Sequence, residues 1–214
     1  RNCVMPGMTG CTGSGSGFVM AKAHQYHDAG GDHNYAVNCH AIDPGRDGFT
    51  VGTIEENDVA HGSIVGGSVV NAGDMGVRFG VSTNGSLDDF HVDNLHISGT
   101  GGEGIRAYNE PTTDITISNV TIENCGKTDS VAAVFIPPSV SGISLDNVTV
   151  RDSYQGPVIK SDESEIDGLR SVGNQTHGAI IENCNHITIS GGVFKNNGQS
   201  GDGAQGLLLS SATN

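Results

Sequence analysis

The sequence is poor in the residues that usually fill a globular core. It has no tryptophan, aromatic residues make up 5% of its 214 positions, and hydrophobic residues make up 35%. This composition is low for a domain with one central core, but a stack of coils that contact only their neighbours tolerates it. No apolar run approaches the ~18 residues of a membrane-spanning helix, so a membrane span is not expected.

Basic residues are scarce as well. Ten lysines and arginines stand against 24 aspartates and glutamates, which gives a formal net charge of −14. Such a surface repels a phosphate backbone, so nucleic acid is not an expected partner. Three explanations of the acidity stay open: a secreted and well-solvated surface, bound divalent cations, or adaptation to high salt. No signal peptide is visible and the chain begins at Arg1, so we expect a processed or partial product of a secreted protein.

Glycine, by contrast, is abundant with 33 residues, and a short motif recurs along the chain. In each copy an alternating apolar and polar stretch meets a turn of Asn or Gly, after which a second alternating stretch begins. The copies are FHVDNLHI (90–97), ITISNVTI (115–122), ISLDNVTV (143–150) and HITISGGVF (186–194). Self-similarity of this kind indicates stacked supersecondary units, and the copies leave no room for a helix.

A further strand is expected after each copy of the motif. The candidate strands start at positions 48, 76, 104, 133, 157, 178 and 206, and the register at Pro157 is open to a shift of one residue. Period-2 alternation predicts an interior column made of Phe49, Val77, Ile105, Val134, Ala179 and Leu207. We therefore predict an all-β, single-stranded parallel β-helix of about seven coils over residues 36–214, preceded by a loop-rich N-terminal cap over residues 1–35. A β-sandwich is the alternative, although sandwiches rarely repeat one side-chain column over so many units.

Asparagines fall at one turn position of these coils. Asn94, Asn119 and Asn147 share this place, and Gly67 and either Gly191 or Gly192 are expected to fill it elsewhere. Asn tolerates the left-handed backbone of a tight turn, and its amide can hydrogen-bond to the same amide one coil away. The turn residues therefore predict a ladder of amides along the stack.

The cysteines divide into two groups. Cys125 and Cys184 each follow Ile-Glu-Asn, which predicts equivalent coil positions and buried, inert thiols. Cys3 and Cys11 can close a small N-terminal loop in an oxidising compartment.

The outward positions of the further strands carry the first candidate site. Arg78 and Arg106 are expected on adjacent coils about 4.8 Å apart, where two guanidinium groups repel unless an anion lies between them. Asp74 and Glu103 precede these two strands. The four residues are candidate catalytic residues, because arginines can hold an acidic sugar while a carboxylate transfers a proton. Surface ion pairs that satisfy one another are the alternative.

Two further groups are candidate metal ligands. The first consists of His24, His27, Asp28, Asp32 and His33. Imidazole and carboxylate groups suit a metal ion, and a polar N-terminal cap is the alternative. Asp43 and Asp47 flank a Pro-Gly turn and are candidate calcium ligands, although a structural turn explains the same residues.

The repeats resemble those of the right-handed parallel β-helix proteins, the pectate-lyase-like superfamily. The resemblance covers residues 36–214 and rests on ITISNVTIENC, ISLDNVTVRDS and HITISGGVFKNN. It implies a protein that binds or acts on polysaccharide along one face of the helix, which is an inference from fold-level analogy. Pectate lyases of this superfamily use an arginine base beside calcium-binding acids. Arg78 or Arg106 with Asp74 and Glu103 resembles that arrangement in kind.

Other motifs of the superfamily are missing. Of the polygalacturonase motifs only Asp88-Asp89 is present, in a different context. The epimerase motif Asp-Pro-His-Glu is replaced by Asp43-Pro44-Gly45-Arg46. The resemblance therefore assigns no catalytic residue by motif.

Two functional hypotheses follow. The leading one is an extracellular enzyme that binds and cleaves an acidic, uronate-containing polysaccharide by lyase-type or hydrolytic chemistry. In this hypothesis His96 and Tyr108 bind substrate, and calcium is the cofactor. The alternative is a non-catalytic structural or adhesive β-helix, such as a virion spike or a cell-surface fibre. Because the strand at 207–209 ends the repeats, we expect a missing cap, further coils or a partner chain, as in a homotrimer formed through the C-terminal coil.

Overall fold

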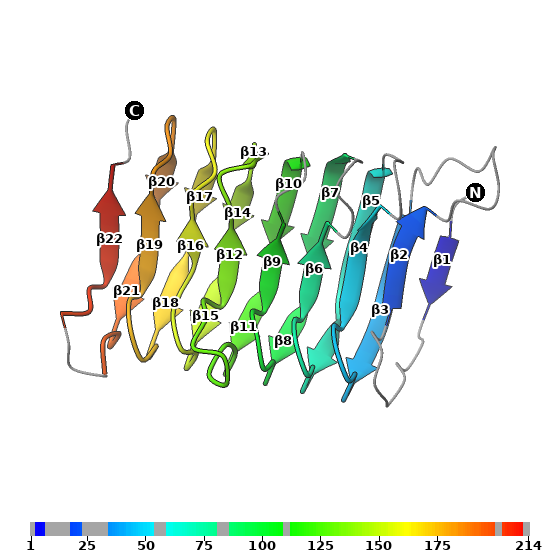
Figure 1. Ribbon diagram of the computed structural model, residues 1–214, viewed down its shortest axis with the longest axis horizontal. Helices are drawn as coiled ribbons and strands as arrows, with labels where there is room; N and C mark the ends of the chain where they lie inside the picture. Colours follow the sequence, from blue (N-terminus) through cyan, green and yellow to red (C-terminus); the bar gives the residue numbers. More distant parts are fainter. Residues whose placement is uncertain are drawn as a thin grey trace.

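The computed structural model of the chain describes residues 3–6, 18–22, 34–53, 59–80, 86–108, 112–199 and 203–211. The regular elements of these residues are all strands, and the paired strands run parallel. Figure 1 shows them stacked as successive coils along one axis, with β1 and β22 at opposite ends. The prediction of an all-β parallel solenoid is therefore confirmed.

One sheet contains eight strands in the order β2-β4-β6-β9-β12-β16-β19-β22. These strands are β2 (Phe18–Lys22), β4 (Phe49–Thr53), β6 (Val77–Phe79), β9 (Ile105–Ala107), β12 (Val134–Ile136), β16 (Val158–Ile159), β19 (Ala179–Glu182) and β22 (Leu207–Ser210). All except β2 are the further strands predicted from the sequence. Phe49, Val77 and Ile105 pair in register and are fully buried, as the alternation predicted.

The other sheet contains 14 strands and holds both halves of each motif. The first halves form β7 (Leu87–Asp93), β10 (Thr112–Ser118), β13 (Val140–Ser141), β14 (Ser144–Asp146), β17 (Glu165–Asp167) and β20 (Thr188–Ser190). The second halves form β8 (His96–Ser98), β11 (Thr121–Glu123), β15 (Thr149–Arg151), β18 (Arg170–Val172) and β21 (Val193–Lys195). The long strands β3 (Asn34–Ile42) and β5 (Val59–Val70) join the halves, and β1 (Cys3–Pro6) pairs with β3.

Left-handed residues turn the chain between the two halves of each motif. Asn94, Asn119 and Asn147 have φ values of 54°, 51° and 51°. The Nδ2 of Asn147 donates to Oδ1 of Asn119 at 2.8 Å, which is a rung of the predicted amide ladder. Asn119, however, donates to Oδ1 of Asp93 at 2.9 Å instead of to Asn94. The ladder thus mixes amides and carboxylates.

Two predicted registers are shifted by one residue. The turn position on β5 is taken by Gly66, with a φ of 69°, and not by Gly67. On β16, Gly156 and not Pro157 aligns with Gly178. A Cβ on Gly156 would lie 1.6 Å from the carbonyl oxygen of Gly178, so only glycine fits where the two coils approach.

The predicted equivalence of Cys125 and Cys184 is wrong, although both are buried free thiols as expected. Cys125 follows β11 in the 14-stranded sheet, and its N–H donates to Oγ of Ser153 on the next coil at 3.1 Å. Cys184 follows β19 in the eight-stranded sheet. The partner expected for Cys3, Cys11, lies outside the described residues, so that disulfide stays a prediction.

The interior column is one continuous apolar cluster from Ala36 to Cys184. Because inward side chains hold the coils together, the outward side chains are left to form surfaces of their own. Within the expected N-terminal segment, β1 and β2 add in register to β3 and β4. No helix long and apolar enough to cross a membrane occurs in the part of the chain that the structure describes.

Candidate functional site

The register of the eight-stranded sheet places Arg78 and Arg106 next to each other. They pair across β6 and β9, and each is the central residue of a strand whose two flanking residues are buried, so both side chains point outward. On the following strand, β12, Phe135 pairs with Arg106. A strand spacing of about 4.8 Å sets the separation of these three positions along the stack.

Tyr108 lies between the two arginines. The Cζ atoms of Arg78 and Arg106 lie 4.4 and 4.6 Å from the centroid of the Tyr108 ring. Each cation–π contact stabilises by about 0.5–1 kcal/mol at an exposed site, which offsets part of the repulsion between the guanidinium groups. The hydroxyl of Tyr108 donates to Sδ of Met75 at 3.8 Å, which helps to hold the ring in place.

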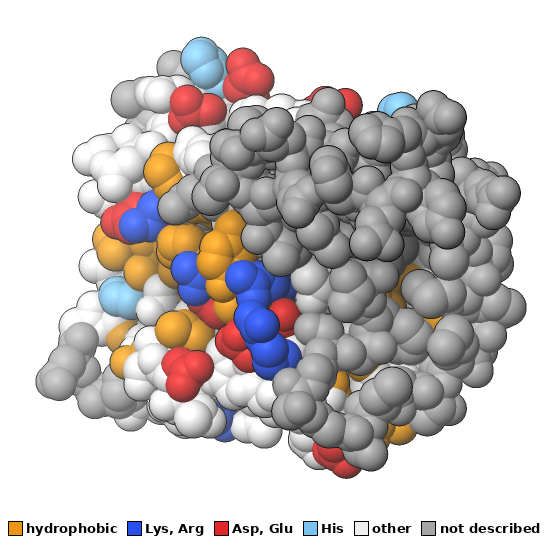
Figure 2. Space-filling model, turned by 45° about the vertical axis from the view of Figure 1, so that its right-hand side comes forward, with side chains coloured by type: hydrophobic (Ala, Val, Ile, Leu, Met, Phe, Trp, Pro, Cys, Tyr) orange, Lys and Arg blue, Asp and Glu red, His pale blue; other side chains and the backbone are white. Residues whose placement is uncertain are grey.

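Aromatic and cationic side chains continue along the stack. Cζ of Arg106 lies 5.2 Å from the centroid of the Phe135 ring, and Nζ of Lys160 lies 5.9 Å from the same centroid. Figure 2 shows lysine and arginine side chains gathered beside hydrophobic ones, with acidic side chains next to them. We use the name arginine track for the set Arg78, Tyr108, Arg106, Phe135 and Lys160.

Each arginine pairs with a buried carboxylate at the corner that precedes the sheet. Nη1 of Arg106 lies 2.8 Å from Oε1 of Glu103, three residues earlier in the chain. The equivalent corner position before Arg78 holds Met75, which has no carboxylate to offer. Arg78 instead pairs with Asp47 on the preceding coil, where Nη1 of Arg78 lies 3.7 Å from Oδ2 of Asp47. Burial raises the pKa of Glu103 above its ordinary value, and the Arg106 guanidinium opposes that rise.

Asp74 is the third carboxyl group of this surface. It is half-buried, and its carboxylate accepts no hydrogen bond from the residues that the structure describes. Partial loss of hydration raises the pKa of Asp74, and repulsion from Asp47 adds to the rise, whereas Arg78 and Arg46 lower it. Asp74 therefore binds a proton more strongly than an ordinary aspartate does.

Arg78 and Arg106 each keep one buried donor unpaired. The Nε atoms of both residues are buried, and neither finds a hydrogen-bond partner among the described residues. Leaving a buried donor unsatisfied costs about 1–3 kcal/mol.

The two candidate calcium ligands have different partners. Asp47 is 1% exposed and accepts hydrogen bonds from Thr50 Oγ1 at 3.2 Å and from the Met75 N–H at 3.3 Å. Asp43 is exposed and accepts from Nδ2 of Asn71 at 3.0 Å. No group of three or more His, Cys, Asp and Glu side chains in the described ranges is arranged to hold a metal ion. Calcium binding at these two residues stays a prediction.

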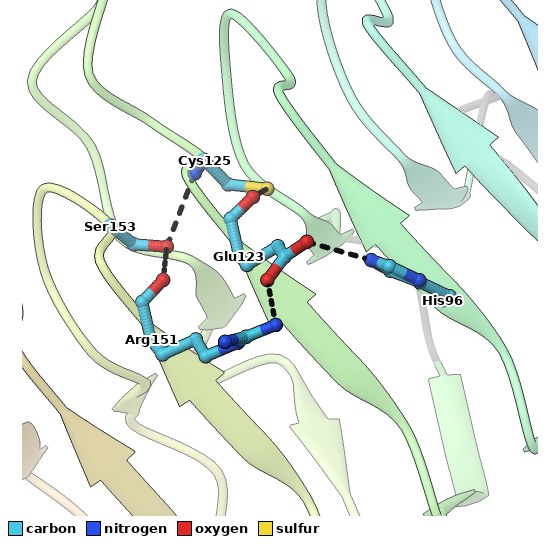
Figure 3. A network of polar contacts seen from close by, with 5 residues as sticks. All are labelled: His96, Glu123, Cys125, Arg151 and Ser153. Carbon is cyan, nitrogen blue, oxygen red and sulfur yellow. Dashed lines mark hydrogen bonds and ion pairs between the residues drawn. The ribbon is translucent and has the colours of Figure 1, made fainter.

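His96, the expected substrate ligand, lies away from the arginine track on the 14-stranded sheet. Its Nε2 lies 3.0 Å from Oε1 of Glu123, and the other carboxylate oxygen of Glu123 pairs with Arg151. Figure 3 shows His96 and Arg151 both pointing toward the carboxylate of Glu123, with Cys125 and Ser153 above and to the left of it. These side chains span three coils, so the structure separates His96 from Tyr108 and gives it a network of its own.

Two residues were not expected beside the arginines from the sequence. Asp47 was predicted as a calcium ligand, with a structural turn as the alternative, because its pairing with Arg78 depends on which residue occupies the corner one coil later. Lys160 was missed because the shifted register of β16 obscured its place beside Phe135. The remaining candidates, His24, His27, Asp28, Asp32 and His33, lie outside the described residues.

Comparison with known proteins agrees with this architecture. A family described as the right-handed β-helix region matches residues 79–213. Among solved structures, the chain is similar to a double mutant of the periplasmic alginate epimerase AlgG, with 16% sequence identity and a TM-score of 0.60. This similarity covers 77% of the chain and 36% of the epimerase chain, so the chain spans little more than a third of that protein. No curated protein matches it. Since the matched region exceeds half of its length, the chain belongs to the right-handed β-helix family.

Proposed function

We propose that the chain acts on an acidic, uronate-containing polysaccharide at the arginine track, by moving the proton at C5 of a uronate ring. Removal of that proton begins both lyase cleavage and epimerisation, so the proposal covers both reactions. The observation that carries it is the pair of outward arginines that are paired in register on adjacent strands and share contact with Tyr108.

The arginines would neutralise the substrate carboxylate. A carboxylate at the outer edge of Arg78 and Arg106 relieves the repulsion between two like charges on adjacent coils and accepts charge-assisted hydrogen bonds. Neutralising that carboxylate also stabilises the enolate-like charge that develops when the C5 proton leaves. Phe135 and the exposed edge of Tyr108 supply apolar area for the faces of neighbouring sugar rings.

Asp74 is the proposed proton acceptor. A carboxyl group whose pKa is raised toward the working pH is better suited to proton transfer than an ordinary aspartate is, and Asp74 is such a group. Glu103 is held by Arg106 and serves to position that guanidinium. After proton removal, the electron pair either expels the C4 substituent, which cleaves the chain, or takes a proton on the opposite face, which inverts C5.

The similarity to a periplasmic alginate epimerase supports the substrate class and a secreted or periplasmic location. At 16% identity this likeness concerns the fold, so the reaction is assigned from the residues above. Dependence on calcium is a separate part of the proposal and is tested with it.

The test is incubation of the protein with alginate and with pectate in D₂O, with and without calcium. A lyase generates the ultraviolet absorbance of an unsaturated uronate. An epimerase leaves the chain length unchanged and introduces deuterium at C5, which NMR detects. Absence of both signals for both polymers would refute the proposal.

Variants place the reaction on the track. Asp74→Asn and Arg106→Ala are each expected to lower the rate by at least about 100-fold, because each removes a proton acceptor or a neutralising charge. Arg170→Ala is the matched control, since Arg170 is exposed on β18 of the other sheet. Equal losses in the control and in the track variants would place the chemistry elsewhere.

A structural or adhesive role is the second candidate, and exposed apolar side chains favour it. Ile42 on β3 is 39% exposed, and Val193 on β21 is 44% exposed. Exposed apolar area of this kind is typical of a protein–protein contact. Light scattering that shows a stable trimer, together with no activity on uronates, would favour this role over catalysis.

A further inference from the structure

A depression on the opposite sheet is lined by residues of three successive coils. Tyr35 on β3 pairs with Ser63 on β5, and Ser63 pairs with His91 on β7. The backbone positions of Tyr35 and His91 are therefore two strand spacings apart, about 10 Å, with Ser63 between them. The depression has a volume of about 280 Å³, and its lining includes Gly62, His61 and Asp89 as well.

Small residues form its floor. Ser63 is the one outward side chain between the rings of Tyr35 and His91, and Gly62 next to it carries none. A gap of this width between two flat side chains accepts one pyranose ring with a carbon–hydrogen face toward each. We use the name histidine slot for Tyr35, His61, Gly62, Ser63, Asp89 and His91.

One carboxylate fixes both imidazoles at the edge of the slot. Nδ1 of His61 lies 2.6 Å from Oδ2 of Asp89, and Nε2 of His91 lies 3.1 Å from Oδ1. When Nε2 of His91 donates to Asp89, Nδ1 of His91 becomes an acceptor. The three side chains are 44–52% exposed, so a ligand in the slot can reach them.

The charge of the slot selects its ligand. Hydrogen bonds from the two histidines lower the pKa of Asp89, the bond from His61 having the larger effect, so Asp89 stays anionic in mildly acidic solution. Among the residues that the structure describes, no lysine or arginine lines the slot. An anionic sugar would be repelled here, whereas the hydroxyls of a neutral sugar can donate to Asp89.

We propose that the histidine slot binds one residue of a neutral, hydroxyl-rich glycan. The ring stacks between Tyr35 and His91, and its hydroxyls hydrogen-bond to the carboxylate of Asp89. The slot lies on the 14-stranded sheet and the arginine track on the eight-stranded sheet, so the inference does not depend on the proposed uronate chemistry.

Calorimetric titration with neutral oligosaccharides tests the proposal. The probes are maltohexaose, cellohexaose, mannohexaose and galactohexaose, with hexamannuronate as the charged comparison. We expect at least one neutral probe to bind with a Kd below about 10 mM, and we expect the slot variants described below to leave the binding of hexamannuronate unchanged. The proposal is overturned if no neutral probe binds in that range.

Variants locate the binding. His91→Ala removes one wall, and Asp89→Asn removes the acceptor with little change of shape; each is expected to weaken binding by about tenfold or more. His40→Ala is the matched control, because His40 is also exposed on this sheet, where its Nδ1 lies 2.9 Å from Oγ of Ser68. Circular dichroism confirms folding of each variant. Binding that survives both slot variants would overturn the assignment.

Discussion

The electrostatics of Asp74 predict that an inactivating substitution stabilises the protein. Loss of hydration, followed by repulsion from Asp47, raises the pKa of Asp74 in the folded state above its ordinary value of 3.8. Between the unfolded and folded pKa values the folded protein therefore binds more protons, and its stability falls as the pH rises. Asp74→Asn removes this unfavourable charge and keeps the shape of the side chain.

The magnitude follows from the exposure of the group. Asp74 is only half-buried, so solvent screens the interaction and the gain at about pH 7 is on the order of 0.5 kcal/mol. For a chain of this length that gain moves the urea midpoint by roughly 0.2 M. At about pH 3, where the aspartate is protonated in both states, the two proteins should unfold at the same urea concentration.

Urea unfolding of the two proteins at both pH values, together with the C5 assay, checks this reasoning. The expected result combines higher stability at neutral pH with a loss of activity, as at other sites where function requires an unfavourable charge. A variant that is less stable at neutral pH would show that Asp74 is stabilised by a partner. A stability gain that persists at low pH would show that charge is not its cause.

Three further substitutions test the scaffold by urea unfolding. Gly156→Ala should prevent folding or cost more than about 3 kcal/mol, because its Cβ would lie 1.6 Å from the Gly178 carbonyl oxygen. Asn119→Ala should cost about 1–2 kcal/mol more than Asn119→Gly, because only the alanine strains the left-handed backbone. Glu123→Gln should cost less than about 1 kcal/mol, since its partner Arg151 is half exposed and solvent screens their attraction.

The fold could be predicted from the sequence because each coil repeats the same steric requirement. Glycine precedes most strands of the eight-stranded sheet, and at Gly48, Gly76 and Gly104 a Cβ would lie within 3 Å of a neighbouring coil. The need for glycine at the close contact between coils therefore marks where each strand of the eight-stranded sheet begins better than hydrophobic alternation does. It also explains the error at β16, where Pro157 was aligned in place of Gly156.

The site could be predicted only in part. The adjacency of Arg78 and Arg106 follows from counting residues between coils, so the sequence was enough. The partner of Arg78 was not predictable in this way, because Met75 at the corner of its own coil diverts it to Asp47 on the preceding one. The ion pair that an arginine forms at a corner depends on residues of two coils at once. An alignment of the repeats compares equivalent positions only and does not show such a pair.

The histidine slot was missed for a different reason. Tyr35, Ser63 and His91 are 28 residues apart in each step, the same step as the coils, so the sequence did contain the signal. Nothing in the residue types alone marks a tyrosine, a serine and a histidine as one surface. The depression exists because Ser63, between Tyr35 and His91, is small. The effect of its size is visible only when the three strands are placed side by side.

The two surfaces differ in their charged side chains, and the solenoid explains how one chain can hold both. The outward residues of each coil can change while its inward residues keep the same contacts, so a surface can change without disturbing the core. In the arginine track each cation lies beside a carboxylate: Arg78 beside Asp47, Arg106 beside Glu103 and Lys160 beside Glu182. The described lining of the histidine slot holds the carboxylate of Asp89 and no lysine or arginine, so a polyuronate bound to the track would be repelled from it.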